Sequence, residues 1–492
     1  MINIYCSLFS DIYLFISFFI LFTIGIFLNL NKKYNFPNIY KITCYFIYIF
    51  IFNIIILDNQ SNLINYNSYD FIKNDADIII KWILFVIVLV FLSYSYFYIK
   101  TIKLHLFEYI LTIYFTILSF SLFISTTDLL SFYLLLEIQS LCFYILTAFN
   151  KNNQYSLESG LKYFILSSFS SVCLLYGFSF IYGITGSLNF NDIYLFFINI
   201  ENNNNILFEH SYYIISVFIL VAFLFKLYIA PFHIWVGDIY QGAPSMTTAL
   251  FATLTSLPLF YIFIKLWISL FYWLQPTFLY FICLLCILSM ILGMFSALCQ
   301  QKIKRLIAFS SVSNIGYLLI AFIQENIQSY SYSLIYFIMY IINITGIFAI
   351  FLNLYINKNK FFIERFTLLS GLFIKNKILA GCLILLFFAS AGIPPFPLFI
   401  IKILILTGLS YNYFTILIFI LVFTAILSSY YYIRIIKNIS FNTTSNWILI
   451  NNINYYNALI IIYIIISNIL FFILLGNYIY IVGDYIILSI YY

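Results

Sequence analysis

Charged side chains are scarce in this sequence. Asp, Glu, Lys and Arg make up 8% of its 492 residues, whereas soluble domains contain about 25%. Hydrophobic residues make up 64% of the chain, and a soluble fold must still cover its outside with polar groups. The composition therefore excludes a soluble protein and places the chain in a lipid bilayer.

The sequence also has little that could hold a metal or a redox group. It has three histidines, and its eight cysteines mostly stand alone in or beside apolar segments. Cys283 and Cys286 have CxxC spacing, but no second pair and no nearby histidine completes a metal site. The sequence has no nucleotide-binding loop and no haem ligand pair. We therefore expect no cofactor in this chain and place any electron transfer in other proteins.

Apolar runs long enough to cross a bilayer, about 20 residues each, recur from residue 10 to residue 480 with short polar loops between them. No soluble domain fits between these loops. The sequence therefore predicts an all-α polytopic membrane protein with about fourteen spans, at residues 10–30, 39–57, 79–99, 106–125, 129–149, 161–186, 211–230, 245–272, 277–299, 303–323, 331–356, 378–406, 412–433 and 456–480.

Basic residues alternate between the predicted loops. All but five of the 22 Lys and Arg residues lie in odd-numbered loops, while Lys73 and Lys81 lie in an even-numbered loop beside acids such as Asp77. Because basic loops stay on the side of synthesis, the odd-numbered loops, including residues 357–377, are expected in the matrix or cytoplasm and both termini on the opposite face. The net charge of +6 is then an orientation signal, and we expect no nucleic-acid partner.

Four ionisable residues remain inside the predicted spans: Glu137, Lys226, Lys265 and Lys402. A charged side chain at the centre of a spanning helix costs about 2.5–3.5 kcal/mol, so such groups persist when they are paired, hydrated or functional. Because the short side chain of Glu137 cannot reach an interface, its position favours a function. Lys265 lies near the outer end of its span and is expected to extend towards the interface, although a static ion pair is the general alternative.

Prolines accompany two of these lysines in reversed order. Lys226 precedes Pro231, and Lys402 follows Pro397 in a proline cluster. Proline breaks a helix, and broken backbone at membrane depth survives where it is buried in protein or lines a hydrated cavity. Such breaks at matching positions are typical of inverted-repeat transporters. The sequence predicts an N-terminal three-helix segment, two inverted five-helix repeats with broken seventh and twelfth helices, and a C-terminal helix, at residues 1–105, 106–272, 273–436 and 437–492.

A carboxylate and lysines in a dry interior suit proton relay. Burial disfavours a charged lysine and a nearby carboxylate favours it, so movement of Glu137 towards or away from Lys226 would load or unload a proton. His233 follows the first break, where its ring is suited to pass protons near neutral pH. A structural role, in which the His233 ring only forms hydrogen bonds, is an equal alternative.

Five segments resemble the signature segments of the proton-conducting membrane subunits of respiratory complex I. They occur in the order and spacing of that family: LEIQSLCFYIL (136–146), ESGLKYFILSSFSS (158–171), FKLYIAPFHIWVGDIYQGAP (225–244), KIKRLIAFSSVSNIGYLL (302–319) and SAGIPPFPLFIIK (390–402). Within the family, DIYQGAP, ESGLKYF and Lys402 are similar to the subunit 2 branch.

The resemblance implies roles for individual residues. Glu137 and Lys226 would be the coupled pair, and Lys402 would end the half-channel towards the outer side. Lys162 would join the line of polar groups along which the proton moves. It is also suited to the simpler role of a basic residue that fixes the orientation of the chain in the membrane. The family usually has a central lysine in the eighth span, but this sequence has Ser256 at that position. Lys265, nine residues later, is about 13.5 Å along and on the opposite helix face.

The resemblance also implies partners and a location. FMN, iron-sulfur clusters and ubiquinone are expected in partner subunits, with neighbouring antiporter-like and small membrane subunits and phospholipids such as cardiolipin as contacts. Heavy use of Ile, Phe, Tyr, Asn and Lys is typical of an AT-rich genome and favours the mitochondrial inner membrane, with both termini on the intermembrane-space side. Two alternatives stay open: a cation/proton antiporter subunit, and a structural subunit that has lost pumping with the eighth-span lysine.

Overall fold

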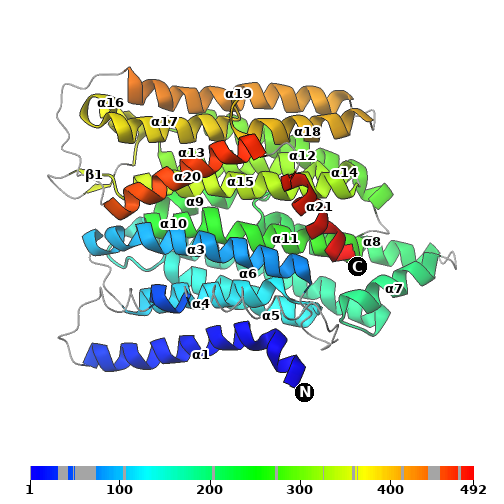
Figure 1. Cartoon of the computed structure of the whole chain (residues 1–492). Coiled ribbons are helices and arrows are strands. Elements are labelled where there is room, and N and C mark those ends of the chain that lie inside the picture. Colours follow the sequence, from blue (N-terminus) through cyan, green and yellow to red (C-terminus); the bar gives the residue numbers. More distant parts are fainter. Residues whose placement is uncertain are drawn as a thin grey trace.

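The computed structural model describes residues 2–30, 43–47, 49, 74–102, 107–201, 206–271, 275–324, 326–356, 361–362, 364–411, 415–441, 455–474 and 478–491. This part of the chain is almost entirely helical (Figure 1). One short antiparallel pair of strands pairs Tyr355 with Phe362. The predicted all-α fold is thus confirmed for the described residues.

The long helices of the first half are α1 (Ile2–Leu30), α3 (Asp75–Ile102), α4 (Phe107–Ile124), α5 (Leu129–Thr147), α6 (Gln154–Thr185) and α8 (Ile206–Lys226), with the shorter α7 (Phe190–Glu201) and α9 (Ile234–Gly242). A continuous helical segment follows, made of α10 (Ser245–Leu250), the π-helical turn η2 (Phe251–Thr255), α11 (Ser256–Leu266) and the π-helical turn η3 (Trp267–Phe271).

The second half contains α12 (Gln275–Leu298), α13 (Ile303–Leu319), α14 (Ala321–Gln324), α15 (Ile327–Phe351), strands β1 (Tyr355–Ile356) and β2 (Phe361–Phe362), the 3-10 turn η5 (Phe366–Leu369), α16 (Leu372–Lys375), α17 (Lys377–Ala391), α18 (Pro397–Tyr411), α19 (Thr415–Ser440), α20 (Tyr455–Leu474) and α21 (Tyr478–Tyr491).

Most long helices lie side by side with their axes roughly aligned (Figure 1). Nine helices among the described residues are long and apolar enough to cross a membrane, and shorter apolar helices accompany them. The beginning of α1 and the end of α21 lie at one end of this bundle, and β1 and α16 lie at the other. The first and last described helices therefore have their outer ends at the same end of the bundle.

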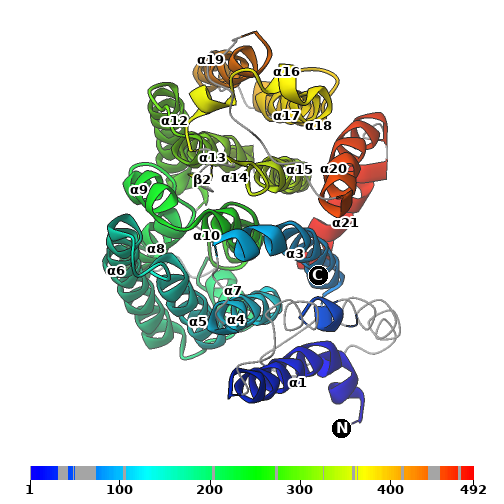
Figure 2. The ribbon, with the colours of Figure 1, turned by 90° about the vertical axis from the view of Figure 1, so that its left-hand side faces the viewer.

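The middle of the bundle is formed by the helical segments Ser245–Phe271, Ile303–Gln324 and Ile327–Phe351. Within these segments, 94%, 94% and 83% of the apolar window is buried, against 33% for α19 and 39% for α6. Viewed along the helices, α10 and α13 lie inside a ring that α6, α12 and α19 border (Figure 2). Polar side chains on the central segments are thus shielded from lipid by protein.

Both predicted helix breaks are present. The first separates α8, which ends at Lys226, from α9, which begins at Ile234. Pro231 has no N–H for a helical hydrogen bond, and Tyr228 has a positive φ of 48°. The second break separates α17 from α18, with Gly392 at a φ of 73° as the C-cap of α17.

The structure differs from the predicted spans at α7 and at the C-terminal helices α20 and α21. The short helix α7 lies in a segment that was expected to be a loop. The C-terminal segment contains two helices, α20 and α21, where the sequence predicts one. The predicted second span, 39–57, lies mostly outside the described residues.

A protease site inserted after Ser370, just before α16, and another at the C-terminal end of α21 are expected to be cut from opposite faces of the membrane. The reason is that α16 and that end of α21 lie at opposite ends of the bundle (Figure 1). Cleavage in oriented vesicles, read by immunoblot, checks this. An untreated and a detergent-permeabilised sample are the controls. Cleavage of both sites from the same face would contradict the arrangement.

Candidate functional site

The first break places a buried lysine near the half-buried carboxylate of Glu137. Lys226 is the last residue of α8 and is 8% exposed. The carboxylate of Glu137, on α5, lies within electrostatic range of its ammonium group, and the two are not among the ion pairs of the described residues. Glu137 Oε2 accepts a hydrogen bond of 3.1 Å from Ser140, while its Oε1 is buried with no partner among the described residues. An unpaired, buried carboxylate oxygen is suited to accept a proton or a water molecule.

The second break holds another buried lysine. Lys402, on α18, is 9% exposed, and its Nζ lies 4.9 Å from the ring centroid of Tyr317. An ammonium group at this distance is attracted to the ring face. Gly392 makes room for it, since a Cβ added there would lie 3.3 Å from Lys402 Nζ. Neither Lys226 nor Lys402 is among the ion-paired lysines of the described chain.

Ser256 lies between the two breaks, at the start of α11. It is 1% exposed, and its hydroxyl donates to the carbonyl of Ala252 at 3.4 Å. The π-helical turn η2 directly precedes it. Pro258 cannot donate to the carbonyl of Leu254, which gives a physical reason for irregular helix at this point. Single π-helical turns are frequent at functional sites.

Lys162 and His233 lie closer to the edge of this region. Lys162 forms ion pairs with Glu158 at 2.7 Å and Asp238 at 3.1 Å, and its side chain is 42% exposed. Arg305 binds the second oxygen of Asp238 at 2.6 Å. The Asp238 carboxylate therefore binds two cations, Lys162 and Arg305, in a partly exposed cluster. The ring of half-buried His233 packs edge-on against Phe309.

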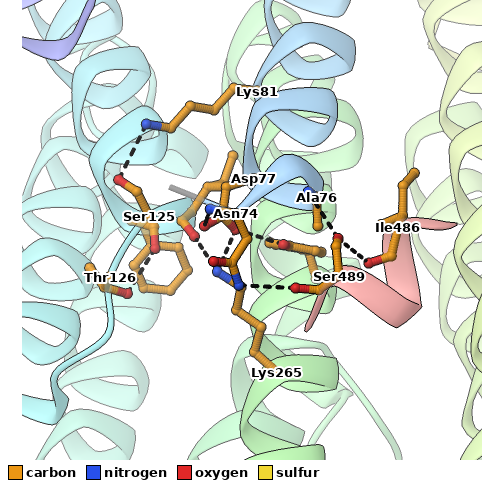
Figure 3. Close-up of polar contacts among 12 residues, drawn as sticks. Asn74, Ala76, Asp77, Lys81, Ser125, Thr126, Lys265, Ile486 and Ser489 are labelled. Carbon is orange, nitrogen blue, oxygen red and sulfur yellow. Dashed lines mark hydrogen bonds and ion pairs between the residues drawn. The ribbon is translucent and has the colours of Figure 1, made fainter. Parts of the chain in front are cut away.

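Lys265 is buried in an ion pair, so the prediction that it extends towards the interface is wrong. Its Nζ pairs with Asp77 of α3 and donates to the carbonyl of Ile124 at 2.9 Å (Figure 3). The hydroxyl of Tyr261 donates to the same Asp77 oxygen at 2.6 Å. All residues of α11 are buried, so the Lys265 side chain does not face lipid and instead reaches a carboxylate.

A second buried ion pair lies one helical turn away. Lys81, also on α3, donates to both oxygens of Asp11 at 3.2 and 3.0 Å and to Ser125 at 3.2 Å. Lys81 is 1% and Asp77 0% exposed, so their prediction as loop residues is wrong. Asp77 also accepts from the N–H of Asn74 at 3.4 Å, a contact that caps the start of α3.

The broken helices with buried lysines define a class of protein, a polytopic membrane protein built like an ion transporter. The sequence model of one family, described as NADH:quinone oxidoreductase/Mrp antiporter, TM, matches residues 126–428, which is more than half of the chain. The chain belongs to this family, as the resemblance predicts.

Curated relatives support a particular branch of the family. The chain is 38% identical over 355 residues to NADH-ubiquinone oxidoreductase chain 2 of Marchantia polymorpha, covering 72% of this chain and 71% of the relative. It is 37% identical over 339 residues to NADH-quinone oxidoreductase subunit N of a Wolbachia species, covering 68% and 70%. Similarity to the Arabidopsis thaliana chain 2, at 30% identity, covers 91% and 89%.

Solved structures share the fold at lower identity. A chain of respiratory complex I from Thermus thermophilus matches with a TM-score of 0.76 and 20% identity, covering 96% of this chain and 98% of that one. A chain of the Mrp complex from Dietzia matches with a TM-score of 0.80 and 14% identity, covering 100% and 99%. At these identities the likeness concerns the fold.

Lys265→Met is expected to destabilise the protein by about 3–5 kcal/mol, because it leaves Asp77 charged, buried and unpaired. The double variant Lys265→Met/Asp77→Leu is expected to recover most of that loss, since it removes both charges. Thermal denaturation of the solubilised protein and its membrane level measure the effect. Lys437→Met, at an exposed position on α19, is the control. A single variant as stable as this control would contradict the ion pair.

Gly392→Ala is expected to cost about 1–2 kcal/mol, because only glycine adopts positive φ without a steric penalty, and to press on Lys402. Thermal denaturation checks the stability. Gly381→Ala on the same helix is the matched control, because no atom lies within 4 Å of its added Cβ. Equal stability of the two variants would show that the glycine at the break is dispensable.

Proposed function

We propose that this chain is a proton-translocating membrane-arm subunit of NADH:ubiquinone oxidoreductase, driven by redox chemistry in other subunits. The observation that carries the proposal is the pair of helix breaks, each beside a buried lysine without an ion-pair partner in the described chain. Relatives of the chain carry the names of subunit N and chain 2 of that enzyme. The enzyme is therefore the whole complex, and this chain supplies a proton path.

The path begins at Glu137 and Lys226. When the carboxylate lies near, the charged lysine is favoured, and when the carboxylate moves away, the buried ammonium group tends to release its proton. Ser256 occupies the middle of the route, where a hydroxyl orients water but stores no proton at neutral pH. Lys402 then receives the proton and passes it towards the outer face. Lys265 stands outside this path, in its own ion pair.

The wider arrangement follows from the same proposal. About fourteen spans form two inverted five-helix repeats, with the first half carrying Lys226 and the second Lys402. Both termini face the intermembrane space of a mitochondrion, and residues 357–377 face the matrix. FMN, iron-sulfur clusters and ubiquinone belong to partner subunits. Neighbouring antiporter-like and small membrane subunits contact this chain, as do phospholipids such as cardiolipin.

A second candidate function is cation/proton exchange as an antiporter subunit. Its support is the fold, because a chain of the Mrp complex matches the whole length. The identity of 14% is well below the 30–38% shared with chain 2 and subunit N relatives, which favours the first proposal. Co-purification of the tagged chain with a quinone-reducing activity separates the two, since an antiporter subunit would bring no such activity.

Lys402→Ala is expected to lower proton pumping and coupled quinone reduction severalfold while the complex still assembles, because the path loses its final buried amine. Fluorescence quenching of a pH-sensitive dye in vesicles that carry the complex measures pumping, and native gels measure assembly. The control is Lys437→Ala, which removes an exposed lysine of α19.

Two outcomes would refute the proposal. Full pumping in an assembled Lys402→Ala variant would remove this residue from the path. Full pumping in an assembled Lys226→Ala variant as well would support the alternative of a structural subunit that no longer pumps.

A further inference from the structure

The start of α3 is capped by a side chain from the last described helix. Asn74 directly precedes α3, at the position whose side chain usually accepts from an N–H of the first turn. Here the N–H of Ala76 donates to the hydroxyl oxygen of Ser489 on α21, at 3.1 Å (Figure 3). The side-chain amide of Asn74 donates to the carbonyl of Ser489, also at 3.1 Å, and the hydroxyl of Tyr485 donates to Asp75. Ser489 therefore acts as a helix cap from 413 positions along the chain.

The helix that provides this cap is itself fixed to the centre of the bundle. The hydroxyl of Ser331, on α15, donates to the carboxylate of Asp484 on α21 at 2.5 Å. Gly483 packs directly on α15, since a Cβ added there would lie 2.7 Å from Cδ1 of Ile335. α21 therefore connects α15, a central helix, with the first turn of α3.

The capped turn carries the carboxylate of the buried ion pair. Asp77 is the third residue of α3 and is 0% exposed. One of its oxygens accepts from the N–H of Asn74 at 3.4 Å, and the other pairs with Lys265 and accepts from Tyr261. Because the same carboxylate belongs to the turn and to the ion pair, a shift of the turn moves Asp77 relative to Lys265. The geometry of the ion pair therefore depends on how firmly the first turn of α3 is held.

We propose that the C-terminal part of α21 is a clasp, defined as Tyr485 and Ser489, that caps α3 and thereby holds Asp77 in place for Lys265. Ser489 is then a positioning residue that acts on the ion pair through the first turn of α3. Both sides of the clasp lie outside residues 126–428, the part of the chain that the family model matches. The clasp therefore adds a contact to the family core and is independent of the proposed proton path.

A second serine provides a matched comparison for Ser489. Ser489 donates to the carbonyl of Ile486 at 2.9 Å, and Ser467 on α20 donates to the carbonyl of Ile464 at 2.8 Å. Both serines are half-buried. Among the described residues, Ser489 also accepts an N–H from another helix, and Ser467 has no such contact. A comparison of the two separates the clasp from the general effect of a serine in an apolar helix.

Hydrogen-deuterium exchange of residues 75–80, read by mass spectrometry, tests the cap in the native assembly isolated through a tag on this chain. Ser489→Ala is expected to speed exchange there by about two- to thirtyfold, the range that loss of a helix cap gives. Ser489→Thr keeps the acceptor oxygen and is expected to exchange like the unmodified chain. Ser467→Ala is the control. Equal exchange in Ser489→Ala and Ser467→Ala would refute the clasp.

A double-mutant cycle tests the link between Ser489 and Lys265. Linked sites give non-additive losses of stability, whereas distant sites without shared partners are usually additive. The fall in melting temperature of Ser489→Ala/Lys265→Met is expected to be smaller than the sum of the two single falls, because the cap no longer has an ion pair to hold. Ser467→Ala/Lys265→Met is the additive control.

Additive losses for Ser489→Ala and Lys265→Met would refute the positioning role. Should Lys265→Met not assemble, Tyr261→Phe replaces it in the cycle, since it also removes one hydrogen bond to Asp77. Neither exchange nor melting temperature measures pumping, so failure of the clasp leaves the proposed function untouched. Loss of pumping in Lys402→Ala with additive stabilities would support the proton path and refute the clasp.

Discussion

A backbone group left without a hydrogen bond inside a bilayer costs several kcal/mol, and this constraint determines where the protein departs from regular helix. Pro231 breaks one helix and Pro397 begins another. Ile229 and Ala230, between the halves of the first broken helix, are 0% exposed. The freed backbone groups are thus surrounded by protein, and the neighbouring lysines share that shielded environment.

The breaks and their lysines could be predicted because their signals are local. Proline within an apolar run marks the break, and a short carboxylate such as Glu137 far from a span end cannot reach water. The ion pair of Asp77 with Lys265 could not be predicted, since it joins residues 188 positions apart. Lys81 lies near the start of α3, where a lysine usually marks the end of a membrane span. Only the packing of α1 against that part of the bundle shows that Lys81 is buried.

The buried lysines fall into two groups with different chemistry. Lys81 and Lys265 each have a carboxylate partner, and a partner that favours the charged form holds the proton in place. Lys226 and Lys402 have no such ion pair in the described chain. Removing one member of a pair leaves a buried charge behind, so the paired group stabilises the contacts between helices. In the proposed path, the unpaired group exchanges protons without disrupting those contacts.

In the proposed path, Ser256 stands where the resemblance implies a central lysine, and this changes the physical problem of proton transfer. A lysine there would be a place to store a charge, at the cost of desolvating it in a segment that is 94% buried. A serine removes both the cost and the storage site. The route between Lys226 and Lys402 must then pass a proton on without holding it, and hydroxyl groups that both donate and accept are suited to that task.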